Sequence, residues 1–168
     1  MPANCAAHDT GAYAARHNPA VYYRPIAGDC ARWDQPMGTT SSGNLIRDLR
    51  AGDLPDFTFI TPNLCNDTHD CPVSTGDTWL QSWVPSILAS PAYATGRTAL
   101  AIVWDEDDGS PLNLVAGIVV APSVVPGTVA TQQFDHYSLL RTTEEMLGLP
   151  TTLANAATAT SMRAAFHL

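Results

Sequence analysis

The stretch TALAIVWDEDDG at residues 98–109 decides the fold, because a short apolar run ends there in four consecutive acidic residues. Its β-forming residues predict a buried strand that delivers carboxylates to the edge of a sheet. In open α/β sheets, ligands bind outside the carboxyl ends of the strands, so these carboxylates are expected to face a site. Clustered carboxylates at that point indicate a hard metal ion. The alternative is a solvated acidic turn closed by Gly109, and for the acidic run taken alone this alternative is the commoner one.

Length and composition indicate one globular domain. The chain has 168 residues, 45% of them hydrophobic and 14% charged, which is enough to fill a single core, so we predict one domain over residues 1–168. No apolar run approaches the ~20 residues that a transmembrane helix needs. The formal net charge of -8 argues against nucleic acid as a partner, because binding to a phosphate backbone depends on Lys and Arg.

The four cysteines are not arranged in the C-x-x-C spacing of a structural zinc site. An even number at these spacings predicts disulfides, and we expect Cys5 to pair with Cys30 and Cys65 with Cys71. Oxidised cysteines indicate a secreted or extracytoplasmic protein. The first residues have neither the basic nor the apolar region of a signal peptide, so we expect that an export signal was removed or that it lies in a missing N-terminal part.

Hydrophobic periodicity and turn residues predict alternating helices and strands. Helical spacing and capping residues predict a helix within residues 39–55 and another over residues 74–90. A third helix follows Asp135, which can cap it. The predicted strands cover residues 56–61, 98–104 and 114–121, with a short helix expected at 13–17 and a loosely attached tail from Thr151. This alternation is typical of a layered α/β protein.

Histidine is the most informative side chain in this sequence, because it both binds metals and transfers protons near neutrality. His17, His69 and His136 each lie beside turn-forming residues just outside a predicted element, where they can reach a common edge. His8 and His167 lie near the termini and are interpreted as structural or exposed. For each histidine taken alone, a capping or solvated role is the commoner alternative.

Several carboxylate and imidazole groups at one edge would suit a metal-dependent hydrolase, in which a histidine protonates the leaving group. Oxygen ligands such as Asp105 and Glu106 favour Mg²⁺, Mn²⁺ or Ca²⁺. The sequence contains no G-x-S-x-G nucleophile motif and no Walker or dinucleotide-binding glycine pattern. These absences argue against nucleoside triphosphate hydrolysis and hydride transfer.

Five motifs, taken in order, resemble the bacterial phosphoesterase family, which holds secreted acid phosphatases and phospholipases C within the alkaline phosphatase superfamily. The resemblance runs from about Asn4 to Pro150. The motifs are RHNPAVYY at 16–23, LPDFTFITPNLCNDTHDC at 54–71, GDTWLQSWVPSILASPAY at 76–93, WDEDDG at 104–109 and FDHYSLLRTTEEMLGLP at 134–150.

This resemblance implies a three-layer α/β/α fold like that of alkaline phosphatase, of which the chain would hold the C-terminal part of the sheet. It implies that phosphate esters are hydrolysed through a phosphorylated hydroxyl nucleophile beside a divalent metal, Mg²⁺, Mn²⁺ or Ca²⁺, or alternatively Zn²⁺. The family's acidic metal-binding pair falls on Asp105 and Glu106. Its catalytic histidines fall on His17 and His69, which would contact the phosphoryl or leaving group. His136 matches a recurring D-H-x-S pattern, as a third metal ligand or a helix cap.

The chain departs from the family pattern in one large respect. In the family, an E-N metal-binding motif and the Ser/Thr nucleophile lie upstream of the part that matches. We therefore expect the C-terminal part of a secreted acid phosphatase-like enzyme for a small phosphorylated substrate, and association with a missing N-terminal segment stays open. The alternatives are a phospholipase C-like phosphodiesterase and a catalytically inactive module that binds phosphate or metal.

Overall fold

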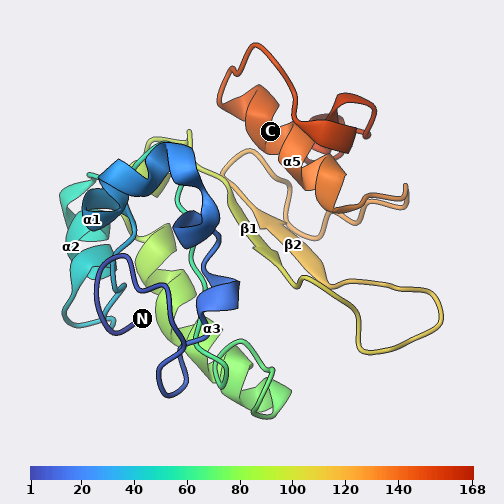
Figure 1. Cartoon of the computed structure of the whole chain (residues 1–168). Coiled ribbons are helices and arrows are strands. Elements are labelled where there is room, and N and C mark those ends of the chain that lie inside the picture. The colour runs from blue at the N-terminus through green and yellow to red at the C-terminus, as the bar shows by residue number, and fades with distance from the viewer. The chain divides into compact units, whose positions relative to one another are not determined.

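A computed structural model describes all 168 residues, which fall into two compact units, Met1–Pro91 and Ala92–Leu168 (Figure 1). Helices occur in both units, and the second unit adds a sheet of two antiparallel strands. This mixture of helices and strands agrees with the predicted α/β class. The predicted three-layer arrangement would need a larger sheet than these two strands form.

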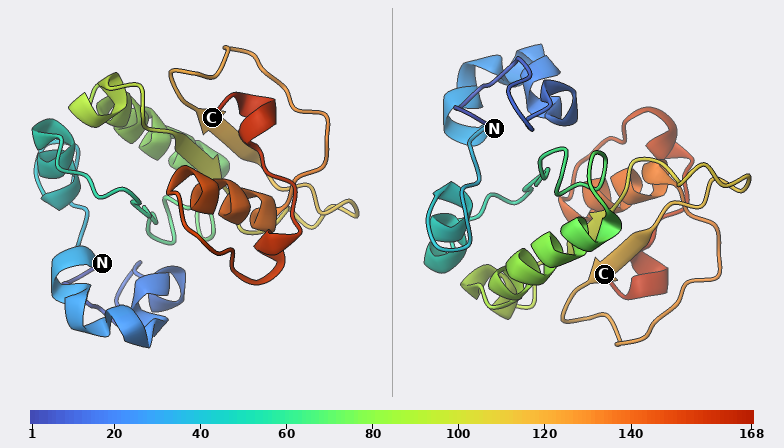
Figure 2. Two further views of the ribbon diagram at one scale, coloured as in Figure 1. Left: turned by 90° about the horizontal axis from the view of Figure 1, so that it is seen from above. Right: turned by 90° about the horizontal axis from the view of Figure 1, so that it is seen from below.

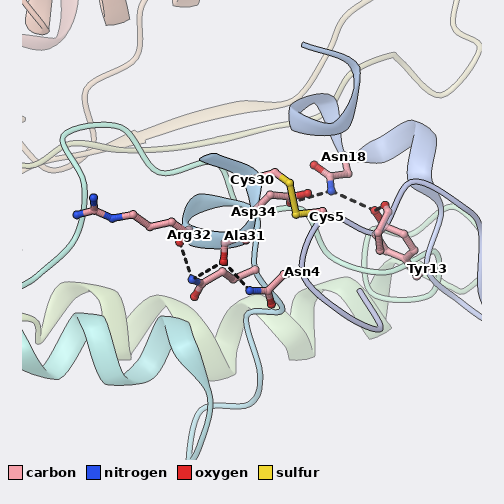
Figure 3. The surroundings of a disulfide bond; sticks show 10 residues. Asn4, Cys5, Tyr13, Asn18, Cys30, Ala31, Arg32 and Asp34 are labelled. Carbon is pink, nitrogen blue, oxygen red and sulfur yellow. Dashed lines mark hydrogen bonds between the residues drawn. A yellow bond between two sulfur atoms is a disulfide. The ribbon is translucent and has the colours of Figure 1, made fainter. Parts of the chain in front are cut away.

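The first unit begins with a series of short helical turns closed by a disulfide. These are the 3₁₀ turns η1 (Ala15–His17), η2 (Pro19–Tyr22) and η3 (Arg24–Asp29) and the single-turn helix α1 (Cys30–Trp33). The short helix expected at 13–17 is thus the 3₁₀ turn η1, which ends before Pro19 because the residue preceding a proline is pushed out of the helical region. The predicted disulfide between Cys5 and Cys30 is confirmed (Figure 3).

Two longer helices supply the core of the first unit. Helix α2, Asn44–Ala51, buries Leu45, Ile46 and Leu49, the apolar residues at helical spacing, and it ends at Gly52 in the left-handed conformation (φ 74°). Helix α3, Val73–Leu88, buries Trp83 and Ile87 and continues through Pro85 without ending. Both predicted helices are confirmed, although α3 begins at Val73, before the predicted cap.

None of the helices combines the length and the apolar character that are needed to span a membrane.

The strand predicted over residues 56–61 is wrong, because this segment has no regular secondary structure. Its alternating aromatic residues Phe57 and Phe59 are 55% and 64% exposed. A strand forms only when its backbone pairs with a neighbour, and the first unit contains no strand to pair with. The alternating pattern therefore could not predict whether a partner strand would be present, and residues 56–59 are all exposed.

The second unit contains the acidic stretch. Strands β1 (Leu100–Val103) and β2 (Gly117–Val120) pair antiparallel, with Leu100 opposite Val120, and they lie side by side in the views of Figure 2. Both predicted strands are confirmed in shortened form, but the expectation that the first is buried is wrong, because no residue of β1 or β2 is buried. The acidic residues follow β1 in the connection to β2, so they lie in a hairpin loop and not at the edge of a parallel sheet.

The helix expected after Asp135 is also confirmed as α5, His136–Met146.

The tail was expected to be loosely attached, and this expectation is wrong. It forms the turn η4 (Ala154–Ala157) and the helix α6 (Arg163–Phe166), and Ala156 is fully buried. Side chains of α5 hold it. Arg141 donates hydrogen bonds to the carbonyl groups of Ala156 and Ala157, and the hydroxyl of Ser161 donates to Glu145. The low apolar content of the tail concealed this polar attachment.

Removing either disulfide should destabilise the first unit, mainly by giving the unfolded chain more freedom. The cysteines are separated by 25 positions in Cys5–Cys30 and by 6 in Cys65–Cys71. Replacing both cysteines by serine should lower the free energy of unfolding by about 3 kcal/mol for the first pair and about 2 kcal/mol for the second. Urea unfolding followed by tryptophan fluorescence measures both changes. Equal stability of each variant and the wild type would contradict the prediction.

Acid should weaken one of the attachments of the tail to α5, the one through Glu145. Hydrogen bonds from Ser161 and then Arg141 lower the pKa of Glu145 below its ordinary value of 4.5. The folded state therefore favours the carboxylate, so this contribution to stability is present above about pH 4.5 and is lost as the pH falls through the lowered pKa. Hydrogen exchange in the tail should accelerate as the pH falls from about 5 to about 3, beyond its intrinsic pH dependence. Ser161→Ala should weaken this effect and Ser123→Ala, at an exposed position, should not; a pH-independent protection of the tail would contradict it.

Candidate functional site

Two of the predicted site histidines lie together in the first unit. His17 is the last residue of η1, and His69 lies in the loop between the irregular segment 56–61 and α3. Their ring centroids are 6.1 Å apart, and the ring planes are inclined by 60°. The structure therefore brings together the two residues predicted to be catalytic, whose roles remain a prediction.

Each histidine has a carboxylate partner on the same ring nitrogen. His17 Nδ1 lies 3.2 Å from Asp67 Oδ2, and His69 Nδ1 lies 2.7 Å from Asp70 Oδ1. An ionised carboxylate can only accept a hydrogen bond, so Nδ1 carries the hydrogen in both rings. Nε2 of each ring is then available to a ligand. It accepts a hydrogen bond when the ring is neutral and donates one when the ring is protonated.

The disulfide Cys65–Cys71, which was predicted correctly, closes the loop that carries His69. Within the loop, Asp67 Oδ1 accepts a hydrogen bond of 2.9 Å from the backbone N–H of His69. Thr68 between them has φ 76°, a left-handed conformation that is costly for a β-branched residue. A residue held in such a conformation indicates that its surroundings determine the loop shape, as is common at functional sites.

Gly76 in the first turns of α3 allows this loop to pack against the helix. A Cβ atom at this position would overlap the side chain of Thr68 and would lie 3.1 Å from the carbonyl oxygen of Asn66. The same loop borders an open groove of about 490 Å³ along α3. The groove is lined by Asn66, Ser74, Thr75, Thr78, Trp79 and Ser82. Hydroxyl, amide and indole groups therefore lie next to the loop that carries His69.

The other predicted site residues lie in the second unit. Asp105 and Glu106 follow β1 and Trp104, and both are exposed. His136 is the first residue of α5, and its Nε2 donates a hydrogen bond of 2.9 Å to the carbonyl oxygen of Trp104. His136 is thus held beside the end of β1. Asp135 provides the N-cap of α5, as predicted.

The remaining two acids of the run form the turn. Asp107 Oδ1 accepts from the backbone N–H of Gly109, and Asp108 Oδ1 accepts from the backbone N–H of Ser110. Gly109 has φ 85°, which favours glycine. The interpretation of Asp107 and Asp108 as turn residues is confirmed. Asp105 and Glu106 make no such turn contacts.

The described residues do not form a complete metal site. No group of three or more His, Cys, Asp or Glu side chains is close enough to hold an ion anywhere in the 168 residues. Asp105 and Glu106 supply oxygen ligands of the kind that Mg²⁺ and Ca²⁺ prefer, but these ions take about six or more. The assignment of Asp105, Glu106 and His136 to a metal therefore stays a prediction.

Sequence reasoning missed the partners of the histidines. Asp67 and Asp70 stand in the same N-D-T-H-D segment as His69, and acidic residues flanking a histidine were the available signal. The network behind His17 was also missed. Asn18 donates hydrogen bonds to the hydroxyl of Tyr13 at 3.1 Å and to the buried carboxylate of Asp34 at 2.8 Å (Figure 3). These contacts connect residues that no local pattern relates.

Sequence comparison places these motifs in a known family. The sequence model of the phosphoesterase family matches residues 3–150, which is most of the chain and spans both units. The chain belongs to the phosphoesterase family, as its ordered motifs predicted.

Relatives with curated names agree with this assignment. A phosphatidylinositol-3-phosphatase of Mycobacterium tuberculosis is 38% identical over 103 residues, which is 59% of this chain and 32% of that protein. An acid phosphatase of Aspergillus fumigatus is 31% identical over 142 residues, 82% of this chain and 31% of that protein. A phosphate-repressible acid phosphatase of Penicillium chrysogenum is 30% identical over 142 residues, 82% of this chain and 34% of that protein.

The chain thus spans about a third of the length of the curated relatives that it matches. No solved structure matches it significantly.

Adding a methyl group at Gly76 should displace the loop that carries His69. In Gly76→Ala, either Thr68 or the helix must move, and overpacking of this kind costs about 1–3 kcal/mol of unfolding free energy. Urea unfolding measures the loss, and the NMR signals of the His69 ring should shift. Gly28→Ala is the matched control, because a Cβ there meets no atom within 4 Å. Similar stabilities of the two variants would contradict the packing role of Gly76.

Proposed function

We propose that the protein hydrolyses phosphate esters and that His17 and His69 contact the transferring phosphoryl group or the leaving group. The observation that carries this proposal is the pair of neighbouring rings, each held through Nδ1 by a carboxylate and each with an unpaired Nε2. Membership of the phosphoesterase family and the names of the relatives support the same chemistry.

In this mechanism the two histidines bind the phosphoryl oxygens, and one of them transfers a proton to the leaving group. A protonated Nε2 donates a hydrogen bond to a phosphoryl oxygen or gives its proton to the departing alcohol oxygen, so that the leaving group departs as a neutral alcohol. The carboxylate at Nδ1 stabilises the imidazolium and fixes the orientation of the ring. The family resemblance implies a hydroxyl nucleophile as the group that attacks phosphorus.

The substrate in this proposal is a small phosphorylated molecule. The groove along α3 begins at Asn66, on the loop that carries His69, so it is placed to receive the alcohol part of a substrate. Its hydroxyl and amide groups can hydrogen-bond a polar leaving group, and Trp79 offers an aromatic face. The name of the mycobacterial relative, a phosphatidylinositol-3-phosphatase, suggests a phosphorylated polyol as one substrate to test.

We also propose that activity depends on a divalent metal ion and that this chain contributes Asp105, Glu106 and His136 to its binding. Oxygen donors at the end of β1 and a histidine held beside them support the idea. An ion there would stabilise the charge that develops on the phosphoryl group. Further ligands are required, because no three candidate side chains of the described chain converge.

The larger fold and the location complete the proposal. A three-layer α/β/α arrangement would give the two strands β1 and β2 a wider sheet to join. An extracytoplasmic location agrees with two disulfides and the absence of any free cysteine in the described chain.

Two alternatives compete with this function. The first is a phospholipase C-like phosphodiesterase, because the same histidine pair could act on a diester. The second is a catalytically inactive module that retains a phosphate or metal pocket. Turnover of a monoester in preference to a diester excludes the first alternative, and phosphate binding without turnover of either supports the second.

Turnover of an aryl phosphate tests the proposal. His69→Ala should lower kcat/KM by about 10²–10⁴, the usual contribution of a general acid or base. Asp105→Ala should abolish the part of the activity that a chelator removes. His8→Ala is the control, because His8 is exposed and belongs to neither group of site residues. Activity that survives His69→Ala would contradict the role of the histidine pair, and activity unaffected by a chelator would contradict metal dependence.

A further inference from the structure

We propose that Asp67 is the positioning residue of this site and that its single carboxylate sets the geometry of both histidines. The inference rests on the proposed function of His17 and His69, because positioning matters only if these rings act on a phosphate. The carboxylate of Asp67 forms hydrogen bonds with both of them. One oxygen holds the ring of His17, and the other holds the backbone of His69.

The contact with His17 joins two distant parts of the first unit. Asp67 Oδ2 lies 3.2 Å from His17 Nδ1, and the two residues are 50 positions apart in the chain. The side chains are only 16% and 25% exposed, so water competes weakly for this hydrogen bond. A backbone hydrogen bond of 3.0 Å from Leu64 to Ala12 ties the same two segments. The two segments are therefore already joined through their backbones, and the Asp67 contact adds a hydrogen bond to the His17 ring.

The backbone around His17 is fixed independently, which leaves the ring as the part that needs a partner. Asn18 is bound to Tyr13 and Asp34, as Figure 3 shows. This network holds the residue that follows His17, so rotation of the imidazole about its side-chain torsions is the remaining freedom. The hydrogen bond to Asp67 restricts that rotation and selects the tautomer with hydrogen on Nδ1.

The contact with His69 acts through the loop. Asp67 Oδ1 accepts from the backbone N–H of His69, closing a turn over Thr68 in its costly left-handed conformation. The disulfide Cys65–Cys71 closes the loop, and the backbone N–H groups of Asp67 and Asp70 donate hydrogen bonds to the carbonyl groups of Asn63 and Leu64. The hydrogen bond from His69 to the Asp67 carboxylate therefore compensates for the strain at Thr68. It also fixes the orientation of the His69 backbone, and so the direction of its side chain.

Asp70 provides a direct comparison. It also holds a histidine Nδ1, at 2.7 Å from His69, but both side chains of this pair are 55% exposed. An exposed pair of neighbouring residues contributes little, because water and salt screen it. Asp70 contacts one histidine and Asp67 contacts two, so the same substitution at the two positions should have unequal effects.

The tautomer of His17 in the wild-type protein tests the proposal before any mutation. Two-bond ¹H–¹⁵N correlation spectra of the imidazole rings show which nitrogen carries the hydrogen, at a pH where the ring is neutral. We expect His17 to carry hydrogen on Nδ1. A His17 ring with hydrogen on Nε2 would overturn the proposal without recourse to a variant.

Asp67→Asn should then shift the tautomer equilibrium of His17 and move the backbone amide signal of His69. An asparagine of the same shape offers one accepting oxygen, so it can replace only one of the two contacts. Asp70→Asn should leave the His17 tautomer unchanged. Asp77→Asn removes the same charge at an exposed position of α3 and should change neither signal. An unchanged His17 tautomer in Asp67→Asn would overturn the proposal.

Kinetics separates positioning from folding. With an aryl phosphate, Asp67→Asn should lower kcat about 10–100-fold, the usual effect of losing the partner that orients an active histidine, with KM changed less than about threefold. Asp70→Asn should lower kcat less than Asp67→Asn, and equal losses would overturn the special role of Asp67. If the wild type turns over no phosphate ester, the proposed function fails, whereas the tautomer measurements still decide whether Asp67 sets the two histidines.

Discussion

The orientation of the His17 ring in the candidate site depends on one hydrogen bond, between Asp67 and His17 Nδ1. It joins the N-terminal segment to the loop between Cys65 and Cys71, which are six positions apart. The N-terminal segment has only short helical turns and the loop has no helix or strand, so neither is fixed by long runs of regular backbone pairing. Disulfides and polar side chains take over this task, as is common where little apolar surface is buried. The two histidines are therefore positioned by covalent and polar constraints more than by a hydrophobic core.

Local patterns predicted the helices α2 and α5, whose backbone hydrogen bonds join residues close in the sequence. Leu45, Ile46 and Leu49 specify α2 through their spacing, and Asp135 specifies the start of α5 through its capping box. Segment 56–61 carried an equally clear strand pattern and formed no strand, because a strand is stabilised by its neighbour. The prediction for the tail was wrong in the opposite way, because ordered structure was present where none was expected. Its weak pattern hid the attachments that α5 provides through Arg141 and Glu145.

The candidate site shows the same division. Its residue types were found from motifs, and His17 and His69 do lie together. Their carboxylate partners were not found, because the pairing of His17 with Asp67 depends on how two segments 50 positions apart meet. The sequence predicted that the acidic run at residues 105–108 is the centre of the chemistry, but in the structure its residues have two different roles. Asp107 and Asp108 build the turn, whereas Asp105 and Glu106 remain as ligand candidates that are not joined by a third group.

The most direct measurement of whether the paired histidines form a phosphate site is an NMR titration of the imidazole ¹⁵N signals with inorganic phosphate. Binding between the two Nε2 atoms predicts that the His17 and His69 signals move together with one dissociation constant, while those of the exposed His8 and His167 do not move. Independent shifts of the two rings, or shifts no larger than those of His8 and His167, would contradict a shared phosphate site.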